Sequence, residues 1–382
     1  MRIGSHLIMR TTLLTTALSL PLALTAAEPA DAARALLESL EISAVAAAAG
    51  GWSSVSDAEL DEIQAGAHDP HRTGFTWQQL EISLSGEVDP WLRMDAYIVA
   101  GDHGIELEEA SLTTTALPWQ LQLEGGYMLS EFGRENPLHP HSWAFIDKTL
   151  PGGAFLGEEG TAGAGIRGSI LLPLEWFAEF HLSMQNPDAE GVISFWGEDE
   201  EGILPDPAST DIDNIGDLLW LARFDNSFDL TQDLSIKLGL SALHGPNRWS
   251  DDSHTTVMGL DLTVKWSNPA APAGAGTLTW TTEYMLRDAE DQPGEDRGTG
   301  WYTHGVYGFM PRWRAGLRID AIDAGAGADE LLRVSPLLMY QPSEFTVLRV
   351  QYNYTDRDAE DAAHAIWFGC EALIGAHPAH AW

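Results

Sequence analysis

The sequence predicts an all-β protein, a transmembrane up-and-down antiparallel β-barrel of about sixteen strands without a plug domain. Successive runs alternate apolar and polar residues, and long and short connections alternate between the runs. Aromatic residues recur near the ends of the apolar faces. The composition agrees, because 37 glycines, 20 prolines and 15 tryptophans suit girdled strands better than helices.

Residues 1–27 read as an export signal, with Arg2 and Arg10 as the basic start, an apolar run over 13–24 and a small-residue cleavage site at 25–27. Beyond it, no stretch reaches the ~18 continuous apolar residues that a spanning helix needs. A helical membrane protein is therefore excluded. A secreted soluble protein and an outer-membrane barrel remain.

Cysteine count and charge narrow the chemistry further. The single cysteine, Cys370, excludes an intramolecular disulfide framework. The net charge of −37 argues against nucleic acid as a partner and favours cations or a saline habitat.

The first predicted strand, residues 40–51, follows a periplasmic lead over 28–39. Alanine forms strands poorly, but the alternation of connections requires one strand before Phe75. An acidic stretch and a solvated loop with His68 and His71 fill the interval.

From Phe75 the alternation of apolar and polar residues is regular and predicts fifteen more strands. They cover residues 75–85, 92–98, 105–116, 119–129, 162–171, 174–185, 218–228, 234–243, 258–266, 278–286, 301–310, 313–319, 331–340, 345–354 and 364–374. The predicted barrel therefore spans 40–374, and 375–382 form a histidine-containing periplasmic tail.

Two connections are long. Residues 186–217 hold ten acidic residues and no basic one. The stretch 131–160 is long enough to fold back into the barrel, with Trp143, Phe145 and Ile146 as anchors to the inner wall. One connection, 267–276, is longer than its place at the periplasmic end predicts.

Aromatic residues near strand ends favour a barrel over a soluble sandwich, because amphipathic rings sit best at a membrane interface. They are Trp119, Trp176, Trp266, Trp301, Trp313 and Tyr340. The chain also ends on Trp382, and a terminal aromatic is typical of substrates of the barrel assembly machinery, although Pro378 interrupts the tail.

Two segments and the end of the chain carry a resemblance. They are GAHDPHRTGFTWQQLEISLSGEVDPWLRMDAYIV, EEASLTTTALPWQLQLEGGYMLSEFGRENPLHPHSWAFIDKTL and IGAHPAHAW. This combination resembles Gram-negative outer-membrane β-barrel proteins of the type labelled zinc-regulated TonB-dependent outer-membrane receptor, or porin-like. The resemblance implies an outer-membrane location and a link to zinc supply. The short segment before the first strand favours a plugless, porin-like barrel.

The polar faces predict a charged lumen. Acidic residues come from the first half of the chain and arginines from the last strands, so opposed walls of unlike charge would create a transverse field. The alternative is that these acidic residues and arginines form local ion pairs and only fill the lumen. The predicted pore-lining residues are Arg134, Arg312, Arg314, Arg318, Arg333, Arg349, Glu124, Glu175 and Glu179.

Histidines suggest metal contacts. His139 and His141 stand two apart in extended chain with Glu135 nearby, and His377 with His380 forms a second pair in the tail. Imidazole is a good zinc ligand, but a site needs three or four converging ligands. Solvated loop histidines are therefore preferred over a high-affinity site, with transient Zn²⁺ contacts in between and no resident cofactor.

No catalytic motif is visible, so we expect no enzyme activity. His181 and Ser183 share a lumen face, but residues two apart on a strand are ~7 Å apart, too far for direct proton transfer. The sequence predicts a porin-like channel for passive or metal-linked uptake of small solutes or cations, surrounded by outer-membrane lipid. The alternative is a non-conducting structural or surface-interaction barrel with acidic external loops.

Overall fold

The computed structural model describes residues 40–101, 104–189, 192–197, 210–250, 252–292, 297–323, 330–357 and 360–375. The predicted signal peptide, the periplasmic lead and the tail histidines His377 and His380 lie outside these residues.

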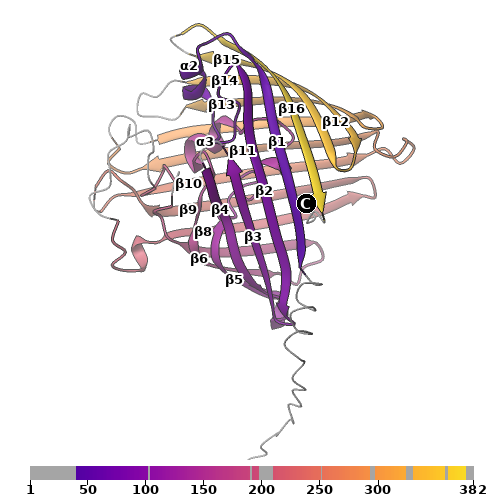
Figure 1. Ribbon diagram of the computed structural model, residues 1–382. Helices are drawn as coiled ribbons and strands as arrows, with labels where there is room; N and C mark the ends of the chain where they lie inside the picture. Colours follow the sequence, from indigo (N-terminus) through magenta and orange to yellow (C-terminus); the bar gives the residue numbers. More distant parts are fainter. Residues whose placement is uncertain are drawn as a thin grey trace, which may run out of the picture. The chain divides into compact units, whose positions relative to one another are not determined.

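Sixteen antiparallel strands close into one barrel, in which β1 pairs with β16 as well as with β2. Figure 1 shows them following one another in sequence order around the ring. The strands are β1 (Glu41–Ser53), β2 (Gly74–Asp89), β3 (Leu92–Gly101), β4 (Gly104–Thr114), β5 (Leu121–Leu129), β6 (Ala162–Leu171), β7 (Phe177–Gln185), β8 (Leu219–Thr231), β9 (Leu234–Pro246), β10 (His254–Ser267), β11 (Thr277–Ala289), β12 (Arg297–Met310), β13 (Trp313–Asp323), β14 (Leu331–Ser343), β15 (Thr346–Arg357) and β16 (Ala363–Gly375). The predicted up-and-down barrel is confirmed.

The alanine-rich first strand forms because it is paired on both sides. Ala44 lies opposite Ile374 of β16 and Ile82 of β2, and Gly51 lies opposite Trp367. Hydrogen bonding to two neighbours and packing override the weak strand propensity of alanine. The alternation of long and short connections therefore predicts this strand better than its composition does.

The predicted starts of two strands, Trp119 and Leu174, lie in turns. Trp119 and Gln120 lie in a 3₁₀ turn, η1 (Pro118–Gln120), and have positive φ angles of 61° and 56°. Strand β5 therefore begins at Leu121. Trp176 lies in the connection before β7. In both cases a proline, Pro118 or Pro173, lies in the turn before these residues and has no backbone N–H for the ladder.

The two faces of the strands carry opposite chemistry. On β10, Met258 and Leu260 point outward and are 55% and 45% exposed, whereas Asp261 and Thr263 point inward and are 1% and 2% exposed. Each strand exposes at least one large apolar side chain outward. An apolar exterior around a polar interior is the inverse of a soluble protein and is typical of a transmembrane barrel.

Exposed aromatic residues lie near both ends of the barrel. Near the end that carries the long connections they include Trp52, Phe75 and Trp77. At the end that carries the short turns they include Trp91, Trp119, Trp176, Trp266 and Phe345. Among the connections of this end, 268–276 is the longest, as the sequence indicated. We call this the turn end and the opposite one the loop end.

Two short helices lie in connections of the loop end. The first, α2 (Asp57–Ile63), begins with a capping box between Ser56 and Glu59, and its Leu60 and Ile63 pack into a cluster with Trp367. The second, α3 (Leu150–Leu156), is capped by Thr149. Two further 3₁₀ turns are η2 (Pro140–Ser142) and η3 (Ile215–Asp217). Within the described ranges no helix has the length and apolar character to cross a membrane.

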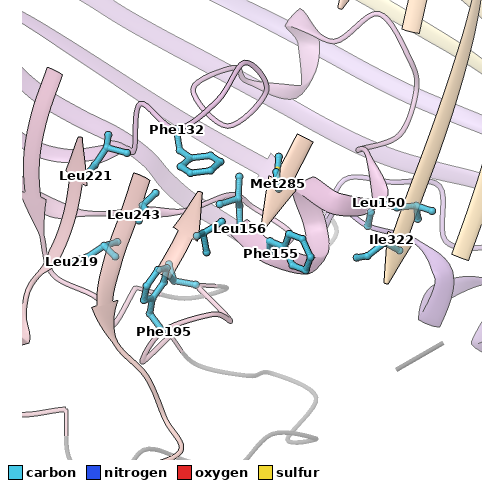
Figure 2. Close-up of a cluster of buried hydrophobic side chains, with 13 residues drawn as sticks. Phe132, Leu150, Phe155, Leu156, Phe195, Leu219, Leu221, Leu243, Met285 and Ile322 are labelled. Carbon is cyan, nitrogen blue, oxygen red and sulfur yellow. The ribbon is translucent and has the colours of Figure 1, made fainter. Parts of the chain in front are cut away.

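An apolar core fills part of the lumen at the loop end, where α3 meets the inward faces of several strands (Figure 2). Phe132, Phe155 and Leu156 come from the connection between β5 and β6, and Phe195 from the next loop-end connection. The strands contribute Leu219, Leu221, Leu243, Val257, Met285 and Ile322. The described chain shows no separate plug domain, but its own connections occupy the lumen.

Candidate functional site

The connection 130–161, which we call the inward loop, is fastened to the wall of β13, β14 and β15 by Asp147. This side chain is fully buried, and its Oδ1 accepts hydrogen bonds from Nη2 of Arg318 at 2.8 Å and Nε2 of Gln351 at 2.6 Å. Its Oδ2 accepts from Nδ2 of Asn353 at 2.6 Å and from Nη1 of Arg333 at 3.2 Å. Four side chains of the wall thus converge on one carboxylate of the loop.

This wall stabilises the charge of Asp147. Burial alone would raise the pKa of Asp147, but the guanidinium groups of Arg318 and Arg333 outweigh burial and lower that pKa below its usual range. Arg318 is further held by Asp320, whose Oδ2 lies 2.7 Å from Nε. The two arginines therefore favour the ionised form of Asp147.

Asp69 joins the connection between β1 and β2 to the inward loop. Its Oδ1 accepts from the backbone N of Lys148 at 2.9 Å, and its Oδ2 accepts from the backbone N of Ala65 at 3.1 Å and of Gly66 at 3.0 Å. Burial, and then the nearby Asp147 carboxylate, raise the pKa of Asp69 to about 7. The two connections therefore form one hydrogen-bonded unit inside the barrel.

Histidines of the inward loop meet glutamates of β2 and β4. Nδ1 of His139 lies 2.6 Å from Oε2 of Glu108, and Nδ1 of His141 lies 2.7 Å from Oε2 of Glu81. The same Glu81 oxygen lies 3.9 Å from Nδ1 of His139, and Oε2 of Glu109 lies 3.9 Å from Nε2 of His139. We call these five residues the histidine–glutamate cluster.

A β-bulge in β4 brings two successive glutamates to this cluster. Tyr97 of β3 pairs with Glu109 and Ile98 pairs with Leu107, so Glu108 is the extra residue. A bulge re-aims a side chain relative to the regular alternation. The ring of Tyr97 also stacks on that of His139 with 4.3 Å between centroids. The wall thus supplies both the carboxylates and a surface that orients the imidazole.

His68 extends the group on the other side of Glu108. Its Nδ1 lies 3.0 Å from the backbone O of Gln78, while its Nε2 lies 3.9 Å from Oε1 of Glu108 and 3.4 Å from Oε2 of Glu159. Glu108 therefore lies between two imidazoles, one on each side.

The expectation of solvated loop histidines is wrong for His139, His141 and His68. His139 and His141 are each 9% exposed, and His68 is 8% exposed. Burial alone would lower the pKa of His139, but hydrogen bonds and charge from Glu108 and Glu109 raise it well above its usual range. For His68, Glu159 and Glu108 likewise outweigh burial and raise the pKa to about 9.

Glu135, predicted to lie with these histidines, bonds elsewhere. Its Oε1 accepts from the backbone N of Thr149 at 3.3 Å, and its Oε2 accepts from Oγ1 of the same residue. It therefore supports the cap of α3 rather than the cluster.

Among the predicted pore-lining arginines, Arg318, Arg333 and Arg349 lie on inward faces and are paired. Nη1 of Arg349 lies 2.8 Å from Oε2 of Glu371, and its Nη2 donates to the backbone O of Trp143 at 3.1 Å. Local pairing, the predicted alternative to an open arginine wall, therefore describes these three. Phe145 and Ile146 pack on the wall, as predicted for anchors of this loop.

The remaining predicted residues are spread over the barrel. Glu124 pairs with Arg167, and Oε2 of Glu179 lies 3.6 Å from Nε2 of His181. The backbone N of Arg134 donates to Oε2 of Glu283 at 3.1 Å. Arg314 is half-buried on β13, whereas Arg312 and Glu175 are exposed in short turns. Those two belong to the turns rather than to inward strand faces.

Sequence reasoning missed a second ionic network in the lumen. Arg223 of β8 pairs with two aspartates. Its Nη2 lies 2.7 Å from Oδ1 of Asp225, and its Nη1 lies 2.8 Å from Oδ2 of Asp261. Nη1 also donates to Oγ of Ser241. The sequence does place each of these residues on the polar face of a strand whose other face is apolar. That they contact one another follows only from the pairing register of the strands.

No family model matches the chain. Its sequence is 27% identical over 370 residues to an uncharacterized protein of Aquifex aeolicus, which covers 85% of this chain and 76% of that protein.

Several solved structures share the fold. The outer membrane channel DcaP of Acinetobacter baumannii gives a TM-score of 0.59 at 13% identity, covering 88% of this chain and 97% of that one. An anion-selective porin from Comamonas acidovorans gives 0.57 at 10% identity, covering 88% and 99%. OprB of Pseudomonas putida gives 0.57 at 10% identity, covering 88% and 94%. The porin-like part of the predicted resemblance agrees with this fold; the zinc-regulated, TonB-dependent part is not supported.

Proposed function

We propose that the protein is an outer-membrane channel for passive diffusion of small solutes, narrowed by the inward loop. The observation that carries the proposal is the anchor of Asp147 on Arg318 and Arg333, which holds a long connection inside a closed barrel with a polar wall. An inward loop in a membrane-spanning barrel limits the size and charge of what passes. The barrels of similar fold named channel or porin support this proposal.

The apolar outward face and the aromatic residues of the turn end support placement in a lipid bilayer, and the predicted export signal supports the outer membrane of a Gram-negative bacterium. Outer-membrane lipid and the barrel assembly machinery are the partners that this placement implies. Nucleic acid is not among them, because the chain carries a net charge of −37.

Cations are the favoured charged solutes. Arg318, Arg333 and Arg349 are paired with Asp147, Asp320 and Glu371. On β2 and β4, Glu81 and Glu108 lie next to His141 and His139, and Oε1 of Glu109 accepts from the backbone N of Leu129 at 2.9 Å. The net charge of −37 supports this preference, because an acidic protein attracts cations and repels anions.

A second function, a non-conducting barrel, is favoured by one observation. The apolar core around Phe155 and Phe195 seals part of the loop end, and both side chains are fully buried. Such a core would stabilise a surface structure as well as a channel.

Liposome swelling separates the two. Proteoliposomes with the wild-type barrel should admit small sugars and amino acids faster than protein-free liposomes, with rates that fall as solute size rises. Replacing residues 138–146 by a short glycine-serine linker should admit larger solutes. Swelling only in the linker variant would favour the non-conducting barrel, and swelling in neither would overturn the channel. Heat-modifiable gel migration confirms that both barrels are folded.

A further inference from the structure

The histidine–glutamate cluster has the composition and geometry of a metal site. We propose that Glu81, Glu108, His139 and His141 bind one divalent transition-metal cation of the class that prefers imidazole and carboxylate ligands, with Zn²⁺ as the representative. The site links the inward loop to β2 and β4. Its effect on conduction rests on the proposed channel function, whereas the binding itself does not.

The distances between ligand atoms suit a small coordination sphere. Nδ1 of His139 lies 2.6 Å from an oxygen of Glu108 and 3.9 Å from an oxygen of Glu81, and Nδ1 of His141 lies 2.7 Å from that Glu81 oxygen. In a tetrahedral zinc site with bonds of about 2.0 Å, ligand atoms stand about 3.3 Å apart. The observed distances bracket this value, so shifts of less than about 1 Å would accommodate the ion.

The ligand types favour a borderline cation over Ca²⁺ or Mg²⁺. Calcium and magnesium take six or more oxygen ligands, or keep several waters, whereas neutral imidazole suits zinc, copper and nickel. Ligand atoms of His139, Glu81 and Glu108 lie within 4.8 Å of one another, and His141 bonds the same Glu81 oxygen. Zinc should therefore bind and magnesium should not.

The wall is built to present these ligands. The bulge at Glu108 aims a glutamate that regular alternation would turn outward, and Tyr97 orients the ring of His139 by stacking. Ligands fixed by a strand bulge and by packing lose little freedom on binding an ion. A solvated group of acidic and basic loop residues would show neither feature.

An independent observation points to a ligand at the same place. The side-chain amide of Gln79 is buried and has no hydrogen-bond partner among the described residues. It lines a cavity of about 20 Å³ together with His68 and His141. Buried polar atoms left without partners are rare and require an explanation such as an ion or water.

The site would act as a second fastening of the inward loop. Asp147 holds one part of the loop on β13 to β15, and the bound cation would hold His139 and His141 on β2 and β4. A filled site should therefore restrict the motion of the loop and reduce ion flow through the channel. Divalent transition metals would then be both a permeant class and a regulator of this channel.

Isothermal titration calorimetry of Zn²⁺ into the purified, detergent-solubilised barrel tests binding directly. The wild type should bind one Zn²⁺ per chain and no Mg²⁺. His139→Gln and Glu108→Gln should each weaken binding by at least about tenfold, because each removes a ligand. His244→Gln is the matched control, since this histidine lies exposed on β9, where it contacts Oγ1 of Thr256 at 2.9 Å and stacks on His254. It should leave the affinity unchanged.

Equal affinity of the wild type and the double variant His139→Gln/His141→Gln would overturn the site, and so would equal binding of Mg²⁺. Zinc-edge X-ray absorption should show nitrogen and oxygen ligands at about 2.0–2.1 Å, with imidazole scattering that the double variant loses. Heat-modifiable migration verifies that each variant is folded.

Conduction is measured separately, so the two proposals fail independently. If Zn²⁺ binds but bilayers show no channel, the site stands and the channel function falls. If the channel conducts but Zn²⁺ gives no calorimetric signal, the channel function stands and the metal site falls. If both hold, Zn²⁺ should lower the conductance of the wild type and leave that of the double variant unchanged.

Discussion

Asp147 and Arg318 are 171 residues apart in the sequence, yet Oδ1 of Asp147 lies 2.8 Å from Nη2 of Arg318. Both side chains are almost completely buried, at 0% and 1% exposure. This ion pair joins the inward loop to the wall of the barrel, and the other contacts of the loop are arranged around it.

Removing the carboxylate should destabilise the barrel. Asp147→Ala leaves Arg318 and Arg333 without their shared partner, and breaking one side of a buried ion pair costs about 3–5 kcal/mol. The free energy of unfolding, measured by urea titration in detergent micelles, should fall by this amount. The control is Asp288→Ala, which removes a pair with Arg297 whose side chains are 51% and 81% exposed. That change should cost at most about 1 kcal/mol; equal losses would contradict the anchoring role.

The apolar core should depend on Phe155. This side chain is fully buried among residues of the loop end, so Phe155→Ala should cost about 3–5 kcal/mol through lost burial and the cavity left behind. Phe368→Ala is the control, because Phe368 points outward and is 57% exposed. Thermal unfolding followed by heat-modifiable migration measures both. A similar loss in the two variants would show that the core is not a discrete stabilising unit.

Arg314 offers a test of charge selectivity without loss of the anchor. It is half-buried on β13, four residues before Arg318 on the same inward face. Arg314→Gln should shift the reversal potential in a salt gradient toward greater cation selectivity and leave urea unfolding unchanged. Arg318→Gln should change both. An unchanged reversal potential in Arg314→Gln would remove this residue from the permeation path.

Gly126 is required by the close approach of β4 and β5. Its φ is 152°, and a Cβ there would lie 2.1 Å from the backbone O of Ala110. Gly126→Ala should therefore lower the yield of folded, heat-modifiable barrel. Gly305→Ala is the control, since a Cβ at that position meets its nearest atom at 3.9 Å, in Trp280. Equal yields would show that the strand pair adjusts without cost.

The strands could be predicted because their pattern is local. Alternation of apolar and polar residues can be recognised over a few consecutive positions. The alternation of long and short connections predicts the strand before Phe75. Local signals that were overlooked explain some differences. The Ser56–Glu59 capping box predicts the start of α2, and Pro118 predicts the turn before β5.

The site could be predicted only in part. His139 and His141 were identified from their spacing, but the glutamates that face them lie 31 and 60 residues earlier in the chain. Glu135, which is closer in sequence, bonds Thr149 instead. Which carboxylate meets which histidine depends on the barrel register and on the bulge at Glu108, and neither leaves a local pattern in the sequence.

Single-channel conductance in planar lipid bilayers tests the central claim most directly. The wild-type barrel should insert in discrete conductance steps, and Asp147→Ala should give larger and noisier steps, because the inward loop is released from Arg318 and Arg333. Asp288→Ala should reproduce the wild-type steps. Steps of equal size in the wild type and in Asp147→Ala, or no steps in either, would contradict a channel narrowed by the inward loop.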